Sequence, residues 1–388
     1  MSRTIAIVAG EPSGDLLASR IIQGVQVKAP DAVFTGIGGS NMAATGMQIQ
    51  YPMDALTVFG YVDALKSLPS LIRTYKGLQK NLLQQRPDVF VGVDAPDFNL
   101  RLEHTLKAAG IPTVHFVGPS IWAWRYERIH KIREAVSHML VLFPFETEIY
   151  EKEGVPVTFV GHPLAAQIPM DPDPVIARES LGLPQDVPLL AILPGSRRSE
   201  IQLLAEPFLQ TAQKLSLHNP QLHFAVPIVN QKRREEFNAI ASKYSIANLH
   251  VFEAKVSKSP ISWDILQACD AALVASGTAT LETALFKRPM VISYKLSPMM
   301  KRLMEWKSGQ AKPYVPWVGL PNVLLKEFAV PELLQDEATP DNLMQACIRA
   351  LEDREYITDL KQKFTQLHYS LRQDTAAKAA EVILKLAK

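Results

Sequence analysis

Two series of short apolar segments, each alternating with helix-forming stretches, constrain the fold of this chain more than any other feature. The first series runs over residues 4–162 and the second over residues 189–295. Short apolar strands separated by helices are typical of a parallel sheet that helices cover on both faces. We therefore predict an α/β protein with two Rossmann-like, doubly wound parallel sheets, whose ligands bind at the carboxyl ends of the strands.

A proline-rich stretch at residues 165–179 interrupts the alternation and is interpreted as a linker. It predicts an N-terminal domain over residues 1–167 and a C-terminal domain over residues 168–350, facing each other across a cleft. Residues 351–388 have a helical pattern with an apolar face near the end. Such a tail is expected to dock on the N-terminal half or on a partner chain.

Charge and cysteine content exclude several classes of protein. The formal net charge of +2 is too small to indicate nucleic-acid binding. Cys269 and Cys347 are the only cysteines, which excludes a disulfide-stapled scaffold and fits a reducing compartment. The chain shows no secretory signal and no apolar run long enough for a membrane span, so a cytoplasmic location is expected.

One loop in the second series has the composition of an anion site. Residues 193–200, LPGSRRSE, follow an apolar strand. Gly195 and Ser196 form a turn there, and Arg197 adds charge where the free N–H groups of a helix start gather. An ordinary turn with a solvated arginine pair explains this loop equally well by itself.

A second loop, residues 275–285 with the sequence ASGTATLETAL, repeats the pattern. Ser276, Gly277 and Thr278 begin a helix directly after a strand. Glu282 lies one turn further, where it is a candidate for binding ribose hydroxyls or, alternatively, for one half of a capping box. Two anion sites in one half of the chain favour a diphosphate ligand.

The loop after the first strand, AGEPSGD at residues 9–15, contains Glu11 and Ser13. It lacks both the GxGxxG and the GK[ST] pattern, so neither a dinucleotide site nor a P-loop is predicted. Its acidic residues suit sugar hydroxyls better than phosphate. The alternative is a plain strand-to-helix turn that Ser13 caps.

Acid–base candidates follow a strand at residues 93–103, where Asp94, Asp97 and Asn99 cluster. One carboxylate at this position could take a proton from an attacking hydroxyl group. Helix capping by Asp97 or Asn99 is the alternative. His115, within a later strand, is a second candidate.

Aromatic and apolar residues give candidates for a lipid-binding side. Trp122 and Trp124 offer flat surfaces, although indoles at this spacing are more often part of a core. Residues 56–78 combine an apolar face, including Phe59 and Val62, with basic side chains, which predicts an interfacial helix or an acyl-chain trough. The alternative is a core-packed helix with a solvated basic face.

Metal binding is not predicted. The acidic DPD at residues 171–173 lies between prolines in the linker and not at a strand end, so it is rejected as a metal site. No histidine cluster has the spacing of metal ligands.

Six stretches together resemble the lipid-A-disaccharide synthase family: AGEPSGD, VDAPDFN, PSIWAWR, LPGSRRSEI, ASGTATLE and GLPNVL, spread over residues 9–325. The resemblance implies the GT-B glycosyltransferase fold and an inverting transfer. The implied donor is UDP-2,3-diacylglucosamine and the implied acceptor is 2,3-diacylglucosamine 1-phosphate (lipid X). The implied products are the β-1,6-linked disaccharide 1-phosphate and UDP.

The same resemblance implies residue roles and a location. The family's essential aspartate, arginine and asparagine match Asp97, Arg197 and Asn322. Asp97 would deprotonate the acceptor 6-hydroxyl, with His115 as the alternative base, and Arg197 would stabilise the leaving diphosphate. The family needs no metal or cofactor and works at the cytoplasmic face of the inner membrane.

Two other functions stay open from the sequence: a UDP-sugar epimerase on the same fold and a nucleotide-binding regulator without turnover. Expected partners are the two acylated substrates, the membrane surface and a second copy in a homodimer, but no nucleic acid. The candidate residues on the UDP-sugar side are Gly195, Ser196, Arg197, Ser276, Gly277, Thr278, Glu282 and Asn322. Those on the acceptor and lipid side are Glu11, Ser13, Phe59, Val62, Trp122 and Trp124.

Overall fold

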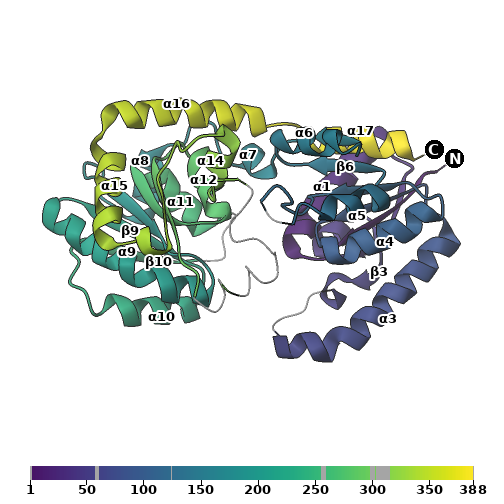
Figure 1. The fold of residues 1–388 in the computed structure, drawn as a ribbon, viewed down its shortest axis with the longest axis horizontal. Coiled ribbons are helices and arrows are strands. Elements are labelled where there is room, and N and C mark those ends of the chain that lie inside the picture. Colours follow the sequence, from purple (N-terminus) through teal and green to yellow (C-terminus); the bar gives the residue numbers. More distant parts are fainter. Residues whose placement is uncertain are drawn as a thin grey trace. The chain divides into compact units, whose positions relative to one another are not determined.

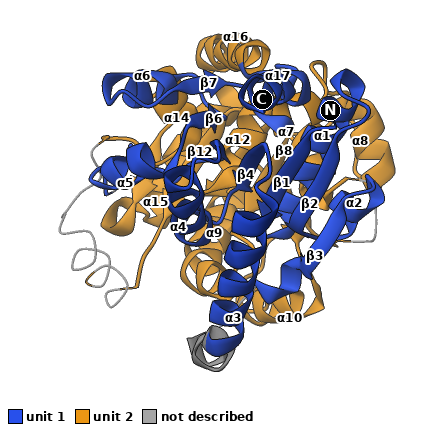
Figure 2. Cartoon of the chain, turned by 90° about the vertical axis from the view of Figure 1, so that its right-hand side faces the viewer, with its two compact units in different colours: residues 1–163, 371–388 blue, residues 164–370 orange. Residues whose placement is uncertain are grey.

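The computed structural model describes residues 2–56, 61–123, 125–254, 259–297, 302 and 315–387, with residues 61–68 described by their backbone alone. The chain divides into two compact units, each built on one parallel sheet (Figures 1 and 2). Unit 1 consists of residues 1–163 and 371–388, and unit 2 of residues 164–370.

Unit 1 has a seven-stranded sheet in the order β3-β2-β1-β4-β5-β6-β7. Its strands are β1 (Thr4–Ala9), β2 (Val33–Gly38), β3 (Gln48–Pro52), β4 (Val89–Val93), β5 (Thr113–Phe116), β6 (His138–Val141) and β7 (Val157–Phe159). Its helices are α1 (Pro12–Lys28), α2 (Ser40–Ala44), the 3-10 helix η1 (Met53–Ala55), α3 (Tyr61–Gln85), α4 (Pro96–Ala108), α5 (Arg128–Ala135), α6 (Phe145–Lys152) and α17 (Thr375–Leu386). Helix α7 (Pro163–Gln167) leads from unit 1 into unit 2.

Unit 2 has a six-stranded sheet in the order β10-β9-β8-β11-β12-β13. Its strands are β8 (Leu189–Leu193), β9 (His223–Ile228), β10 (Leu249–Glu253), β11 (Ala271–Ala275), β12 (Met290–Tyr294) and β13 (Glu332–Leu334). Its helices are α8 (Pro174–Leu181), α9 (Arg198–His218), α10 (Gln231–Ala241), α11 (Ile261–Ala268), α12 (Thr278–Leu285), α14 (Leu320–Leu325), the 3-10 helix η2 (Gln335–Glu337), α15 (Pro340–Glu352) and α16 (Arg354–Leu371).

Helices cover both faces of the first sheet, as the apolar strands predict. Side chains alternate between the two faces of a strand, so Ile5 and Ile7 of β1 join one core cluster with residues of α1 and α17. Ala6 and Val8 of the same strand join a second cluster with residues of α3 and α4. The central strands β1, β4, β8 and β11 are almost wholly buried, because they lie between helical layers.

The C-terminal residues 351–388 are largely helical and are divided between the two units. Helix α16 belongs to unit 2, and α17 returns to unit 1. A buried pair anchors the end of α16, because Nζ of Lys287 lies 2.7 Å from Nδ1 of His368. Nε2 of His368 also lies 2.8 Å from the carbonyl oxygen of Ala165.

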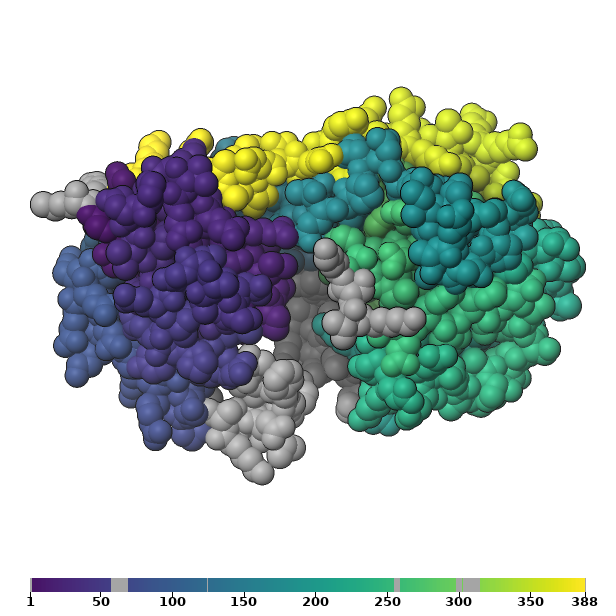
Figure 3. Space-filling model, turned by 180° about the vertical axis from the view of Figure 1, so that it is seen from behind, coloured from purple at the N-terminus to yellow at the C-terminus, as the bar shows by residue number. Residues whose placement is uncertain are grey.

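Helix α17 packs against α1 of the same chain, and Figure 3 shows the last residues in yellow against the first residues in purple. The two helices meet closely at Gly24, where a Cβ atom would lie 2.7 Å from the carbonyl oxygen of Ala376. Ala379, Ala380 and Ile383 are buried there. The apolar face of α17 is thus covered by α1 of the same chain.

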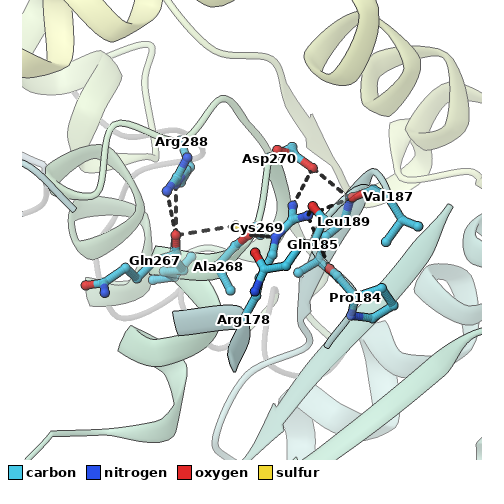
Figure 4. Close-up of polar contacts among 11 residues, drawn as sticks. Arg178, Pro184, Gln185, Val187, Leu189, Gln267, Ala268, Cys269, Asp270 and Arg288 are labelled. Atoms are coloured by element: carbon cyan, nitrogen blue, oxygen red, sulfur yellow. Dashed lines mark hydrogen bonds and ion pairs between the residues drawn. The ribbon is translucent and has the colours of Figure 1, made fainter. Parts of the chain in front are cut away.

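The segment read as a linker is tied into unit 2 by a buried arginine (Figure 4). Arg178 of α8 donates to the carbonyl oxygens of Ala268 and Val187, both at 2.9 Å, and pairs with Asp270 at 3.0 Å. Asp270 in turn accepts the N–H of Leu189, the first residue of β8. The rejected DPD motif has a structural role, since Asp173 caps α8 by accepting the N–H of Val175 at 2.9 Å.

Candidate functional site

A pocket of about 560 Å³ in unit 2 brings together the two glycine-containing loops. The loops follow β8 and β11, which are adjacent parallel strands, so their carboxyl ends meet at one edge of the sheet. Most of the residues predicted for the UDP-sugar side line this pocket: Gly195, Ser196, Arg197, Ser276, Gly277, Thr278 and Glu282.

The first loop is fixed by Glu200, which sequence reasoning did not include among the site residues. Its Oε2 accepts the N–H of Ser196 at 2.8 Å and that of Arg197 at 3.0 Å. Gly195 has φ +105°, and a Cβ atom there would lie 2.4 Å from this oxygen, so the turn requires glycine. Glu200 thus occupies the part of the predicted anion site that those two N–H groups form.

Arg197 stands at the N-cap of α9. Its side chain is 80% exposed, with Nη1 3.7 Å from Oε1 of Glu200, so the guanidinium is available to a ligand in the pocket. The N–H groups that follow in the first turn of α9 also point out of the helix start. An anion in this pocket would therefore meet a fixed cation beside a helix terminus.

The second loop begins α12, with Gly277 at the N-cap and no side chain capping the helix. The hydroxyl of Thr280 donates back to the carbonyl oxygen of Gly277 at 2.8 Å. Glu282 is therefore not half of a capping box with Gly277, and it lines the pocket. Burial raises the pKa of Glu282, and the indole of Trp263 partly offsets this rise.

Asn322, by contrast, is not among the described residues that line this pocket, and its contact with the nucleotide stays a prediction. It is fully buried in α14. Its Nδ2 donates to the carbonyl oxygen of Val330 and to Glu332, both at 2.8 Å, and its Oδ1 accepts the N–H of Val330 at 2.9 Å. These bonds join α14 to the first residue of β13 and to the segment before it.

A second pocket, of about 920 Å³, lies in unit 1 at the carboxyl ends of β1 and β4. Glu11, a candidate for the acceptor side, is among the residues that line it. Ser13 is exposed on α1, is not among the lining residues, and does not cap the helix, because α1 begins at Pro12 with Glu11 at the N-cap. The apolar wall of the pocket is formed by Leu56, Leu71, Ile72, Tyr75 and Phe98.

Asp97 lines the same pocket from the first turn of α4. The residues before it, Asp94 and Ala95, have left-handed backbone angles, with φ 54° and 45°. Asn99 supports this turn, since its buried Nδ2 donates to the carbonyl oxygen of Asp94 at 2.7 Å. Asp97 is not the helix cap; its carboxylate is 86% exposed and accepts a hydrogen bond from Arg128 at 2.8 Å.

His115, the alternative base, is not among the described residues that line this pocket. It is fully buried, and its Nδ1 lies 2.8 Å from Oε1 of Glu103, which is buried as well. Burial raises the pKa of Glu103, and the neighbouring histidine partly offsets this rise. The pair lies between β5 and α4.

Of the remaining candidates for the lipid side, only the side chain of Trp122 is described by the structure. Trp122 packs edge-on against Phe145, with 5.4 Å between ring centroids, and is not among the residues lining the unit 1 pocket. Trp124, Phe59 and the side chain of Val62 lie outside the described residues.

The described residues offer neither a metal site nor a membrane span. No group of three or more histidine, cysteine or acidic side chains in them is placed to hold a metal ion. None of their helices has the length and apolar character that crossing a membrane requires.

Comparison with solved structures identifies the fold. The chain is similar to the MurG structure from Acinetobacter baumannii, with a TM-score of 0.57, 14% identity and coverage of 99% of this chain and 100% of that one. It is also similar to a putative UDP-N-acetylglucosamine 2-epimerase from Listeria monocytogenes, with a TM-score of 0.62, 12% identity and coverage of 99% and 95%. These likenesses establish the fold, which is the two-domain GT-B arrangement.

Comparison of sequences gives relatives of much higher identity than these solved structures. The chain is 61% identical to the lipid-A-disaccharide synthase of Bordetella pertussis, covering 100% of this chain and 99% of the relative. It is 49% identical to the enzyme of the same name from Azoarcus sp. strain BH72, covering 99% and 96%. Residues 5–385 match the lipid-A-disaccharide synthetase family. The chain therefore belongs to the lipid-A-disaccharide synthetase family.

Proposed function

We propose that this chain transfers diacylglucosamine from UDP to the 6-hydroxyl of lipid X, which gives the β-1,6-linked disaccharide 1-phosphate and UDP. The observation that carries this proposal is the apolar pocket of unit 1 with a carboxylate at its edge. An acylated acceptor needs both an apolar wall and a base, whereas the alternative UDP-sugar epimerase needs no acyl-chain surface.

The donor is assigned to the pocket of unit 2. The diphosphate would lie at the start of α9 beside Arg197, and the ribose hydroxyls would be held by Glu282. This assignment is supported by the meeting of the two loops in one pocket. Carboxylates commonly accept hydrogen bonds from the paired hydroxyls of a ribose.

The acceptor is assigned to the pocket of unit 1. Its acyl chains would lie along Leu71, Ile72 and Tyr75, and its sugar would lie near Glu11 and Asp97. Burying apolar area contributes roughly 25 cal/mol per Å² removed from water, so two acyl chains could supply most of the binding free energy.

In the proposed reaction Asp97 removes the proton of the acceptor 6-hydroxyl as that oxygen attacks the anomeric carbon of the donor. The bond between the anomeric carbon and the diphosphate oxygen breaks, and its electron pair leaves with UDP. Arg197 stabilises the charge that develops on the diphosphate. A single displacement inverts the anomeric configuration, which accounts for a β-linkage from an α-linked donor.

Because both substrates are acylated, we place the enzyme on the cytoplasmic face of the inner membrane. The described part of α3 fits such a surface, since Ile72 is 46% exposed and Arg73 and Lys76 follow it. Basic side chains near anionic lipid contribute about 1 kcal/mol each. Sedimentation with phosphatidylglycerol vesicles tests this placement: Ile72→Ser should reduce binding, and unchanged binding would move the contact elsewhere.

The activity itself is tested by incubating the purified chain with UDP-diacylglucosamine and lipid X. Mass spectrometry should detect the disaccharide 1-phosphate together with an equal amount of UDP. A UDP-sugar epimerised at C2, or tight UDP binding without any product, would favour one of the two alternatives.

A further inference from the structure

The unit 1 pocket has an uneven distribution of charge. Glu11, Asp54 and Asp97 line it as acids, and among the described lining residues Arg101 is the single cation. Arg101 is exposed, and its guanidinium makes no hydrogen bond or ion pair with the described part of the chain. A lone, unengaged arginine in an otherwise acidic pocket is suited to one anionic group of a ligand.

Arg101 lies four residues after Asp97 on α4, so the two side chains occupy one face of the helix, about 5–6 Å apart at Cβ. Phe98 lines the pocket beside them and packs edge-on against Tyr75, with 5.4 Å between ring centroids. The helix therefore presents a carboxylate and a guanidinium one turn apart, next to the apolar wall.

The acceptor carries a hydroxyl group, a phosphate and acyl chains that correspond to the carboxylate, the guanidinium and the apolar wall of this pocket. The carbons that carry its 6-hydroxymethyl group and its phosphate flank the ring oxygen, so both groups extend from one edge of the sugar. The two acyl chains leave from C2 and C3, on the opposite edge. A sugar that places its 6-hydroxyl at Asp97 and its acyl chains along α3 thus directs its phosphate along α4.

We propose that Arg101 binds the anomeric phosphate of the acceptor and thereby fixes its 6-hydroxyl at Asp97. This role rests on the proposed function. A phosphate monoester carries a charge of about −1.5 to −2 at neutral pH, and arginine binds such groups with paired hydrogen bonds. The three acids of the pocket repel phosphate from the other positions. The nearby Arg128 is already engaged with Asp97 at 2.8 Å.

A phosphate could reach Arg101 from two sources, the acceptor itself or the headgroup of a membrane phospholipid. Neutral detergent micelles contain no phospholipid, so kinetics measured in them report only on the phosphate of the acceptor. The kcat/KM is measured for 2,3-diacylglucosamine with and without its 1-phosphate at saturating donor, and the ratio of the two values is the readout.

For the wild type this ratio should favour the phosphorylated acceptor. In Arg101→Gln the ratio should fall about 10-fold or more, the range for losing a hydrogen-bonded charge pair. Arg101→Lys should restore part of it, because the charge remains without the planar fork. Arg133→Gln is the matched control, since Arg133 is exposed on α5 and is not among the pocket-lining residues, and its ratio should stay at the wild-type value.

If the wild type is active and the ratio of the two kcat/KM values is unchanged in Arg101→Gln, the role of Arg101 is overturned but the proposed function is not. The same holds if Arg101→Gln lowers kcat/KM equally for both acceptors. Reduced binding of Arg101→Gln to phosphatidylglycerol vesicles with an unchanged ratio would assign Arg101 to the bilayer and also overturn the proposal. A wild type that forms no disaccharide from either acceptor would overturn the proposed function and this role together.

Discussion

Nη2 of Arg128 lies 2.8 Å from Oδ1 of Asp97, and this contact joins the start of α5 to the first turn of α4. Arg128 is more buried than its partner, since its side chain is 22% exposed and that of Asp97 is 86% exposed. The contact engages one carboxylate oxygen and leaves Oδ2 to accept a proton. We infer that Arg128 is a positioning residue for the proposed base.

Arg128→Met should lower kcat about 10- to 100-fold, because a mispositioned base loses its alignment with the acceptor hydroxyl. The dissociation constant for UDP should not change, since UDP is assigned to the other unit. Arg128→Lys should recover part of the rate. Steady-state kinetics with calorimetry of UDP binding check this, and a fully active Arg128→Met would remove the positioning role.

Asp97→Asn should lower kcat about 10²- to 10⁴-fold, because the amide keeps the hydrogen bond from Arg128 but cannot take a proton. The melting temperature should stay near that of the wild type, since the side chain is exposed. Asp94→Asn is the matched control: asparagine tolerates the left-handed φ of 54° at this position. Equal rates for Asp97→Asn and the control would show that Asp97 is not the base.

Arg197→Ala should lower kcat roughly 10²- to 10³-fold, the range for losing one partner of a developing negative charge. Lysine should rescue poorly, because it lacks the planar fork. The adjacent Arg198 is the control, since its Nε lies 3.6 Å from Oε1 of Glu236 and it does not line the pocket. The rate of the chemical step is measured by rapid quench for both alanine variants. Equal rates for Arg197→Ala and Arg198→Ala would contradict the role of Arg197.

Glu146 makes stability depend on pH. It is 5% exposed, and burial raises its pKa to about 7 from the ordinary 4.5. The folded state therefore binds more protons than the unfolded state between these values, so stability falls as pH rises from 4.5 to 7. Glu146→Gln keeps an acceptor for the N–H of Phe143 and removes the ionisation. Its free energy of unfolding should exceed that of the wild type by up to about 3 kcal/mol above pH 7.

Urea unfolding at several pH values measures this difference. The two proteins should have nearly equal stability at pH 4. His162 also makes stability depend on pH, because burial lowers its pKa to about 4. Its contribution to stability rises with pH over an overlapping pH range, opposite to that of Glu146. His162 is present in both proteins, so its effect cancels in the comparison. A difference that does not change with pH would show that Glu146 does not titrate on unfolding.

The sequence predicts most of this fold because the central strands are buried on both faces and so consist of apolar residues. It does not reveal β3 and β13, which lie at sheet edges. Their residues, QIQYP and ELL, are partly exposed and carry no apolar run. An edge strand is defined by its pairing with a neighbour, which a local pattern does not contain.

The site is predictable where it depends on loops at strand ends, and less so where it depends on packing between elements. Gly195 and Gly277 meet because their strands are adjacent and parallel. His115 was a candidate because of its residue type, yet it lies on the face of β5 that α4 covers, opposite Val114 and Phe116. Asn322 is likewise buried by contacts that become visible only in three dimensions.

The central claim is that the 6-hydroxyl of lipid X attacks the anomeric carbon of UDP-diacylglucosamine. An acceptor labelled with ¹⁸O at that hydroxyl tests it most directly, by mass spectrometry of both products. The account predicts one ¹⁸O in the disaccharide 1-phosphate, at the bridging oxygen, and none in UDP, with the reaction nearly abolished in Asp97→Asn. Label in UDP, or no disaccharide from a folded protein that binds UDP, would contradict it.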